Sequence, residues 1–139
     1  MSAVIRLADR VKAFEIVSEA RESHSPEQLH FFRLCIIRAT HLWFGYIDEE
    51  FVGMWGIIPP TFLHTCAYIW LYHTDSVKGR EFLFIRKSRI AMAEVLALYP
   101  EIHGHTVATE ASAIRWLRWL GAEFAEPEGL LIPFVIRRP

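Results

Sequence analysis

Hydrophobic residues near the start of the chain recur with helical spacing. Apolar side chains return every third or fourth position over residues 11–17 and 29–36, the spacing of helices that bury one face. Asp9 precedes the first segment, and Ser25-Pro26 precedes the second. Short polar side chains cap the free N–H groups of a helix, and proline fits its first turn. The pattern therefore predicts two helices that begin at these caps and end near residues 20 and 39.

The middle of the chain carries apolar runs without helical spacing. Residues 41–46, 51–58 and 66–73 are such runs, and residues 3–6 form a shorter one. Runs of this length, rich in aromatic and β-branched residues, are typical of strands. The polar turn 47–50 joins the first two into a hairpin. The unbroken run at 66–73 predicts a buried, central strand.

The last third of the chain predicts two more helices and three more strands. The helices are expected over residues 81–99, closed by Pro100, and over 110–120, closed by Gly121. The strands are expected over 102–108, 123–125 and 130–136. With no repeat or linker in the sequence, residues 1–139 predict a single α/β (α+β) domain.

Composition and charge narrow the function classes. The chain has 139 residues, 53% hydrophobic and 22% charged, as expected for one globular domain. Its net charge of −1 gives no electrostatic case for nucleic acid. Cys35 and Cys66 both stand among apolar residues, which predicts two buried, reduced thiols.

No segment has the pattern of a membrane anchor or a leader. The most apolar stretch, residues 51–63, is interrupted by Pro59-Pro60 and is too short to cross a bilayer. The first residues lack the basic and apolar regions of a signal peptide. We therefore expect no membrane contact and a cytoplasmic protein.

The order of elements and one motif resemble a known superfamily. The last helix carries Ala113-Ile114 and Leu120-Gly121, and this resembles the last motif of the GNAT (GCN5-related N-acetyltransferase) superfamily. Residues 82–135 further resemble internal virion protein A-like proteins of short-tailed phages, which have a GNAT-like fold. The resemblance implies a mixed, mostly antiparallel sheet of about six or seven strands flanked by four helices.

The resemblance also implies a function. A GNAT-like phage protein would transfer an acetyl group from acetyl-CoA to an amine, with a host protein as one candidate acceptor. The other reading is a catalytically weak or inactive scaffold that serves in virion assembly or host-protein binding. Both place the chain in the host cytoplasm, and the second also places it in the virion.

Acyl-CoA binding in this superfamily uses a glycine-containing loop before the long helix, where backbone N–H groups hold the pyrophosphate. The loop pattern is Arg/Gln-x-x-Gly-x-Gly/Ala, and here residues 76–81 read Ser-Val-Lys-Gly-Arg-Glu. Gly79 fits this pattern, whereas Ser76 and Glu81 depart from it, and the Glu81 carboxylate would repel phosphate unless it points away. The resemblance assigns cofactor binding to Leu71, Val77, Lys78, Gly79, Arg80 and Glu110.

The usual general acid is missing. In the superfamily the last helix opens with Asn and carries a Tyr seven positions later; here these positions hold Glu110 and Leu117. Leucine cannot donate a proton to a leaving thiolate. The candidate catalytic groups are Tyr72, His73 and His105, with the turn carboxylates Glu49 and Glu50 as further bases. For each, a packed or solvated side chain is the alternative.

Two other features carry weaker signals. His103 and His105 offer two metal ligands, but zinc requires three or four and no other Cys or His has helpful spacing, so no metal site is predicted. Trp116 and Trp119 cannot both face the core, and an exposed Trp beside Arg115 and Arg118 would suit a protein contact.

Overall fold

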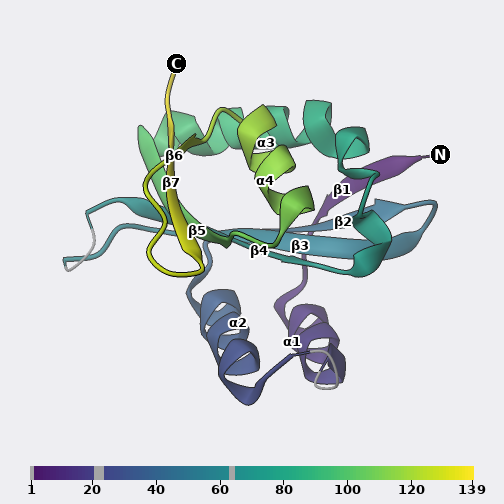
Figure 1. Ribbon diagram of the computed structural model, residues 1–139. Helices are drawn as coiled ribbons and strands as arrows, with labels where there is room; N and C mark the ends of the chain where they lie inside the picture. The colour runs from purple at the N-terminus through teal and green to yellow at the C-terminus, as the bar shows by residue number, and fades with distance from the viewer. Residues whose placement is uncertain (1, 21–23, 63–64) are drawn as a thin grey trace.

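The computed structural model describes residues 2–20, 24–62 and 65–139 (Figure 1). A seven-stranded sheet runs through it in the order β1-β2-β3-β4-β5-β7-β6. The strands are β1 (Ala3–Leu7), β2 (His41–Ile47), β3 (Glu50–Ile58), β4 (Ala67–His73), β5 (Glu101–Val107), β6 (Glu123–Phe124) and β7 (Leu131–Arg137). The predicted strands are all present, and β4 is the central strand, as its unbroken apolar run indicates.

Four α-helices cover the two faces of the sheet. They are α1 (Arg10–Glu19), α2 (Pro26–Arg38), α3 (Ile85–Leu98) and α4 (Ala111–Trp119). Helices α1 and α2 lie on one face, and α3 and α4 lie on the other (Figure 1). Asp9 caps α1, and Ser25 caps α2 in a reciprocal capping box with Gln28, so both predicted helix starts are confirmed.

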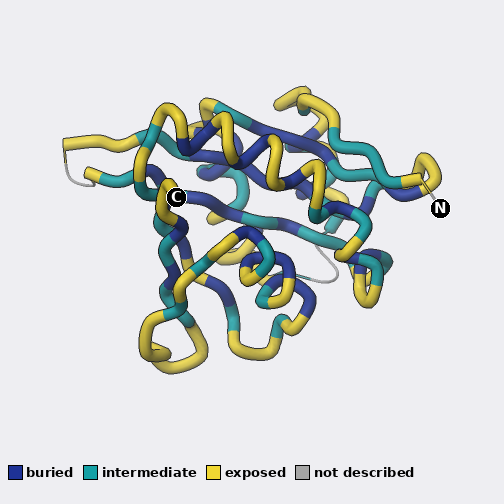
Figure 2. The backbone as a smooth tube through the Cα atoms, turned by 90° about the horizontal axis from the view of Figure 1, so that it is seen from above, coloured by how far each residue is buried: buried dark blue, intermediate teal, exposed yellow. Residues whose placement is uncertain are grey.

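The core has two layers, one on each face of the sheet. Ile69, Met92 and Trp116 belong to the layer beneath α3 and α4. Trp70, Ile36 and Val17 belong to the layer beneath α1 and α2. Figure 2 shows buried positions concentrated along the middle strands and exposed positions in the connecting loops and on the outer turns of the helices. Adjacent residues of β4 therefore serve opposite layers, because side chains alternate along a strand.

Strands β4 and β5 form the one parallel pair among the described strands, and they soon separate. Their register covers only Ala67↔Ile102 and Tyr68↔His103. Gly104 follows at the point of separation, where a Cβ atom would come within 2.9 Å of the Ile69 carbonyl oxygen and would also meet the Phe134 ring. Glycine thus permits the close approach of β5 to its neighbours before the strands diverge.

The long helix begins later than predicted. Residues Glu81–Phe84 form a 3₁₀ helix, η3, and regular α3 starts at Ile85 rather than at Glu81. In a 3₁₀ turn residues three apart lie on the same side. Glu81 and Phe84 are both buried, so the tight turn directs a carboxylate and an aromatic ring inward together.

Two smaller expectations have mixed outcomes. Cys35 is buried, but Cys66 is only partly buried, so the prediction of two buried thiols is wrong for Cys66. Cys66 lies just before β4, at the start of the apolar run, and full burial begins only at the next residue, Ala67. Trp116 is buried and Trp119 is partly exposed, as predicted. No helix within the described ranges is long and apolar enough to cross a membrane.

Candidate functional site

The separation of β4 from β5 opens a cleft in the middle of the sheet. A cavity of about 650 Å³ lies there. Its lining includes Tyr68, Tyr72, His73, His105, Glu110 and Leu117. Three chain segments that are distant in sequence therefore meet at one hollow: the end of β4, the end of β5 and the start of α4. All three candidate catalytic residues from the sequence lie on it.

His73 and Glu110 form a polar pair at this cleft. His73 Nε2 lies 3.1 Å from Glu110 Oε2, and the two side chains are 16% and 41% exposed. His73 Nδ1 lies 3.2 Å from the Thr74 carbonyl oxygen. Both ring nitrogens of His73 therefore lie within hydrogen-bonding distance of an oxygen atom. The resemblance assigned Glu110 to the cofactor, the sequence made His73 a candidate catalytic group at the end of the central strand, and the structure brings the two together.

Tyr72 lies on the opposite side of β4 from His73. Its ring packs edge-on against Phe32, with centroids 5.3 Å apart, and stacks on Phe51. Burial raises the pKa of the Tyr72 phenol above its ordinary value, because the phenolate would lose hydration. Tyr72 is therefore protonated at neutral pH, as an ordinary phenol is, and burial makes it a weaker acid than a free phenol.

His105 and the turn glutamates occupy less enclosed positions. His105 is exposed, and its ring tilts against Tyr68 at a centroid distance of 6.0 Å. Burial, with a smaller contribution from Cys35, raises the pKa of Tyr68 to about 12. Glu49 is an exposed residue of the β2–β3 turn, and Glu50 accepts a hydrogen bond of 2.7 Å from Ser76 Oγ. Glu50 thus holds the loop that follows β4.

The basic side chains of that loop are bound to the loop itself. Lys78 Nζ lies 3.0 Å from Asp75 Oδ1, and both side chains are largely exposed. Arg80 Nε donates to the Ser76 carbonyl oxygen at 2.9 Å. Gly79 has φ +78°, and a Cβ atom there would meet nothing within 4 Å. The positive φ explains glycine at this position, and the open space beside it leaves the backbone approachable.

Glu81 is the unexpected member of the site. It is 4% exposed, and its Oε1 accepts a 2.5 Å hydrogen bond from Arg115 Nε on α4. Its Oε2 has no partner among the described residues. Burial acts to raise the pKa of Glu81, but the N–H groups of Glu81 and Gly79 and the Arg115 guanidinium outweigh it and hold the pKa below its usual value. The carboxylate is therefore a buried anion beside backbone N–H groups.

A site for acyl-CoA must hold both the acyl-bearing arm and the pyrophosphate, and this site suits only the first. The open cleft between β4 and β5, lined by Leu71 and Tyr72, suits the narrow acyl-bearing arm. The pyrophosphate needs free backbone N–H groups at the loop, and the Glu81 carboxylate already occupies their neighbourhood. The residues present therefore fit the acyl arm and do not fit the pyrophosphate while Glu81 is ionised and turned inward.

The position of the missing acid is filled by packing. Leu117 is 3% exposed and lines the cleft. Beside it, Trp116 Nε1 donates to Ser88 Oγ at 3.0 Å and joins α4 to α3. The second half of α4 is thus held by an apolar contact and one buried hydrogen bond.

Sequence reasoning missed the pairing of Glu81 with Arg115. These residues are 34 positions apart, and both looked like parts of solvated helix faces. The signal was present in Glu81 itself, an acidic residue where the loop pattern calls for glycine or alanine. Only the structure shows that the Glu81 side chain points inward.

Comparisons with known proteins address the fold. No protein-family model matches the chain, and no curated protein matches it in sequence. Similar solved structures include PaiA N-acetyltransferase from Thermoplasma acidophilum, in complex with coenzyme A, at 13% identity and TM-score 0.64, with 99% of this chain and 100% of that chain covered.

Two further structures are similar at comparable levels. A GNAT-family acetyltransferase from Streptococcus pneumoniae has 9% identity and TM-score 0.64, covering 96% of this chain and 97% of its own. An acetyl transferase from Salmonella typhimurium, which modifies the N-terminal serine of ribosomal protein L7/L12, has 12% identity and TM-score 0.63, covering 100% and 96%. The likeness extends over nearly the whole length of each chain and concerns the architecture. The chain has the GNAT fold, with its mixed, mostly antiparallel sheet and four helices.

Proposed function

We propose that this chain is an N-acyltransferase that moves an acetyl group from acyl-CoA to an amine in the cleft between β4 and β5. The observation that carries the proposal is the His73–Glu110 pair at a 650 Å³ cleft formed where these strands part. Solved structures with this fold include N-acetyltransferases, one of them in complex with coenzyme A. A fold alone does not fix a function, so the polar pair at the cleft is the stronger support.

The residues of the cleft have distinct chemical capacities. Acyl-CoA, when bound, supplies an acyl group activated as a thioester. Glu110 is a half-exposed carboxylate that can accept a proton from an ammonium or amine. His73 orients Glu110 and can pass that proton on, because Thr74 fixes its other nitrogen. Tyr72, a phenol that lines the cleft, is the proton donor in place of the tyrosine that Leu117 replaces.

The cofactor residues assigned by resemblance fall into two groups. Leu71 and Glu110 line the cleft and belong to the part that suits the acyl arm. Val77, Lys78, Gly79 and Arg80 form the loop, where there is open space beside Gly79 but its N–H is bonded to Glu81, and where the exposed Lys78 is paired with Asp75. We therefore expect the cleft to contribute more than the loop to the affinity for the acyl donor.

The direct test is turnover. Purified protein is mixed with acetyl-CoA and a panel of amines, including spermidine and a peptide with an N-terminal serine, and release of free thiol is followed. We expect activity with at least one amine, and a fall of about 100-fold in Glu110→Gln. Glu126→Gln, which alters an exposed carboxylate of the β6–β7 loop, is the matched control. Absence of thiol release, or equal rates in both variants, would contradict the proposal.

A second function is favoured by two specific observations. Leu117 lines the cleft at the position that the resemblance gives to the usual acid, and the buried Glu81 lies in the loop that the resemblance gives to the pyrophosphate. Both suit a GNAT scaffold without catalysis, serving in virion assembly or host-protein binding. Phage origin, a host-protein amine as acceptor, and a place in the host cytoplasm or virion rest on the resemblance of residues 82–135 alone. The partly exposed Trp119 is a candidate contact for such a partner.

Acetyl-CoA binding separates these functions. A scaffold with a blocked donor site would keep its fold and bind no acetyl-CoA, and an affinity pull-down with Trp119→Ala as the comparison would then identify its protein contact. An acyltransferase would bind acetyl-CoA in the absence of any partner.

A further inference from the structure

A cluster of three potential metal ligands lies at the opposite end of the β4–β5 pair from the cleft. Cys66 Sγ, a carboxylate oxygen of Glu101 and a ring nitrogen of His103 all lie within 4.8 Å of one another. Glu101 and His103 are two residues apart on β5, so their side chains share one face of the sheet. Cys66 arrives from the segment before β4, one position ahead of the pair Ala67↔Ile102.

The donor set is informative about the ion. One thiolate, one imidazole and one carboxylate combine sulfur, nitrogen and oxygen, which suits zinc and similar transition metals and does not suit magnesium or calcium. In a tetrahedral zinc site, ligand atoms lie about 3.3–3.8 Å from one another. The three donor atoms lie within 4.8 Å of one another, and the His103 and Glu101 atoms lie 2.7 Å apart, so side-chain rotations that move these atoms by about 1 Å would bring them to such distances.

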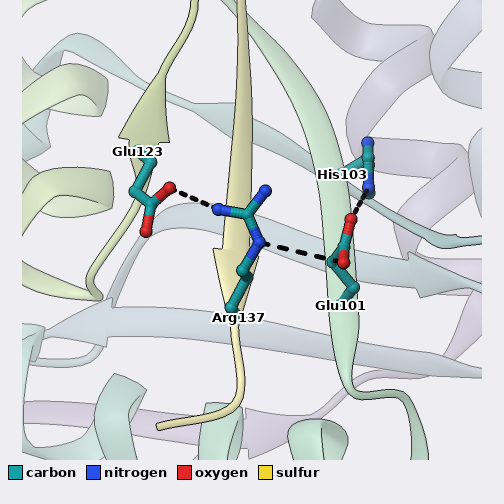
Figure 3. Close-up of polar contacts among 4 residues, drawn as sticks. All are labelled: Glu101, His103, Glu123 and Arg137. Carbon is teal, nitrogen blue, oxygen red and sulfur yellow. Dashed lines mark hydrogen bonds and ion pairs between the residues drawn. The ribbon is translucent and has the colours of Figure 1, made fainter.

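Further polar contacts hold the Glu101 carboxylate of this cluster in place. His103 Nε2 lies 2.7 Å from Glu101 Oε1, while Arg137 Nε lies 3.8 Å from the other oxygen, Glu101 Oε2. Arg137 also bonds Glu123, so its charge is shared between two carboxylates. Figure 3 shows this chain of contacts across three strands, from Glu123 through Arg137 and Glu101 to His103. Such outer contacts orient a metal-binding carboxylate.

We propose that Cys66, Glu101 and His103 bind a divalent transition metal ion of the zinc type, with a fourth position open to water. Binding places the ion where the His103–Glu101 hydrogen bond now lies; the Cys66 thiol proton passes to solvent, and neutral His103 binds through its unprotonated ring nitrogen while the other nitrogen keeps its proton. The side chains of His103 and Glu101 are 45% and 41% exposed, so an ion can enter without unfolding. The site joins β4 to β5 just before the strands separate.

The role that follows is structural support of the cleft. The two strands share only two register pairs among the described residues, and a metal ion would add a cross-link at this short joint. It lies at the ends of β4 and β5 remote from His73 and Glu110, so it takes no part in the proposed transfer. The inference does not depend on that transfer.

Sequence spacing could not reveal this site. His103 and His105 offered only two ligands, and His105 is not part of the cluster. The third donor, Cys66, is far from both in sequence and meets Glu101 only through parallel strand pairing. The expectation of no metal site rested on spacing along the chain, which does not report contacts between strands.

Cobalt(II) is the probe of choice. Reduced, metal-free protein is titrated with Co²⁺ without oxygen, and thiolate-to-cobalt charge transfer and tetrahedral ligand-field bands are recorded. We expect one equivalent to bind, both signals to appear, and Zn²⁺ to displace them. Cys66→Ser should abolish the charge-transfer band, and His103→Gln should weaken binding by at least about tenfold.

Two control variants make the outcome decisive. Cys35→Ala keeps Cys66 and should retain the charge-transfer band, and His105→Gln alters an exposed histidine of the same strand and should retain full affinity. Thermal melts of every variant with and without Zn²⁺ report the fold, and stabilisation by Zn²⁺ is expected only where the three ligands remain. No charge-transfer band in the parent protein, or unchanged binding in Cys66→Ser, would overturn the proposal.

Discussion

Arg115 Nε donates to Glu81 Oε1 at 2.5 Å, joining the middle of α4 to the turn before α3. Glu81 is buried at 4% exposure, and the N–H groups of Gly79 and Glu81 help to keep it charged. An anion bound to backbone N–H groups before a helix is the arrangement that a phosphate would otherwise adopt. The chain thus carries its own anion at the loop to which the sequence resemblance assigns the pyrophosphate.

Removing that charge should strengthen donor binding. In Glu81→Gln the side chain keeps its size and loses its negative charge, and the half-exposed Arg115 guanidinium becomes available to phosphate. We expect the affinity for acetyl-CoA to rise by about tenfold, since one favourable charge contact is worth roughly 1–2 kcal/mol. Isothermal titration calorimetry measures it. The control is Glu126→Gln, and an affinity that stays unchanged or falls in Glu81→Gln would show that Glu81 does not compete with the donor.

The same residue predicts a pH dependence of stability. The pKa of Glu81 is lower in the folded protein than its ordinary value of 4.5. Its stabilising contribution is therefore fully present above pH 4.5 and is lost as the pH falls through the lowered pKa. Urea denaturation from pH 6 downwards should show a loss of stability below pH 4.5 that is smaller in Glu81→Gln. Equal acid sensitivity in the two proteins would argue against an ionised Glu81 in the fold.

Tyr72 gives a prediction about catalysis. Tyr72→Phe removes the proton donor and keeps the ring contacts with Phe32 and Phe51, so the fold and donor affinity should be retained. We expect kcat to fall by about 100-fold, the scale of general acid catalysis. Steady-state kinetics would show this, with Tyr46→Phe, a ring on β2 outside the cleft, as the control. If kcat is unchanged, the proton comes from another donor.

The hydrogen bond between α3 and α4 gives a prediction about stability. Ser88→Ala leaves the buried Trp116 Nε1–H without its acceptor, and an unpaired buried donor costs about 1–3 kcal/mol. Urea denaturation should report a loss of that size. Ser18→Ala, an exposed position on α1, should change stability by less than about 0.5 kcal/mol. Equal stability of the two variants would indicate that water replaces the serine.

Most of the fold could be predicted from the sequence, because its signals are local. Caps at Asp9 and Ser25 defined two helix starts, and the run 66–73 predicted the central strand. The predicted start of α3 was wrong, because Glu81 has the sequence pattern of an ordinary residue in a first helical turn. Its burial depends on Arg115, which no local pattern reports.

The candidate site could be predicted only in part. Tyr72, His73 and His105 stand at the ends of predicted neighbouring strands, so their approach to one cleft followed from topology. The pairing of His73 with Glu110 did not, because it depends on where α4 begins relative to β4. Contacts between distant segments depend on tertiary packing, which the spacing of residues within a single segment does not predict.

The proposed function is tested most directly by calorimetric titration of the protein with acetyl-CoA. We predict saturable binding at one site, with a dissociation constant between micromolar and millimolar, and loss of affinity by at least about tenfold in Gly79→Glu. Gly121→Glu is the matched control, since Gly121 has φ +91°, equally open space and a place at the far end of α4. Absence of binding at millimolar acetyl-CoA, or equal binding by the two glycine variants, would contradict a donor site at this cleft and loop.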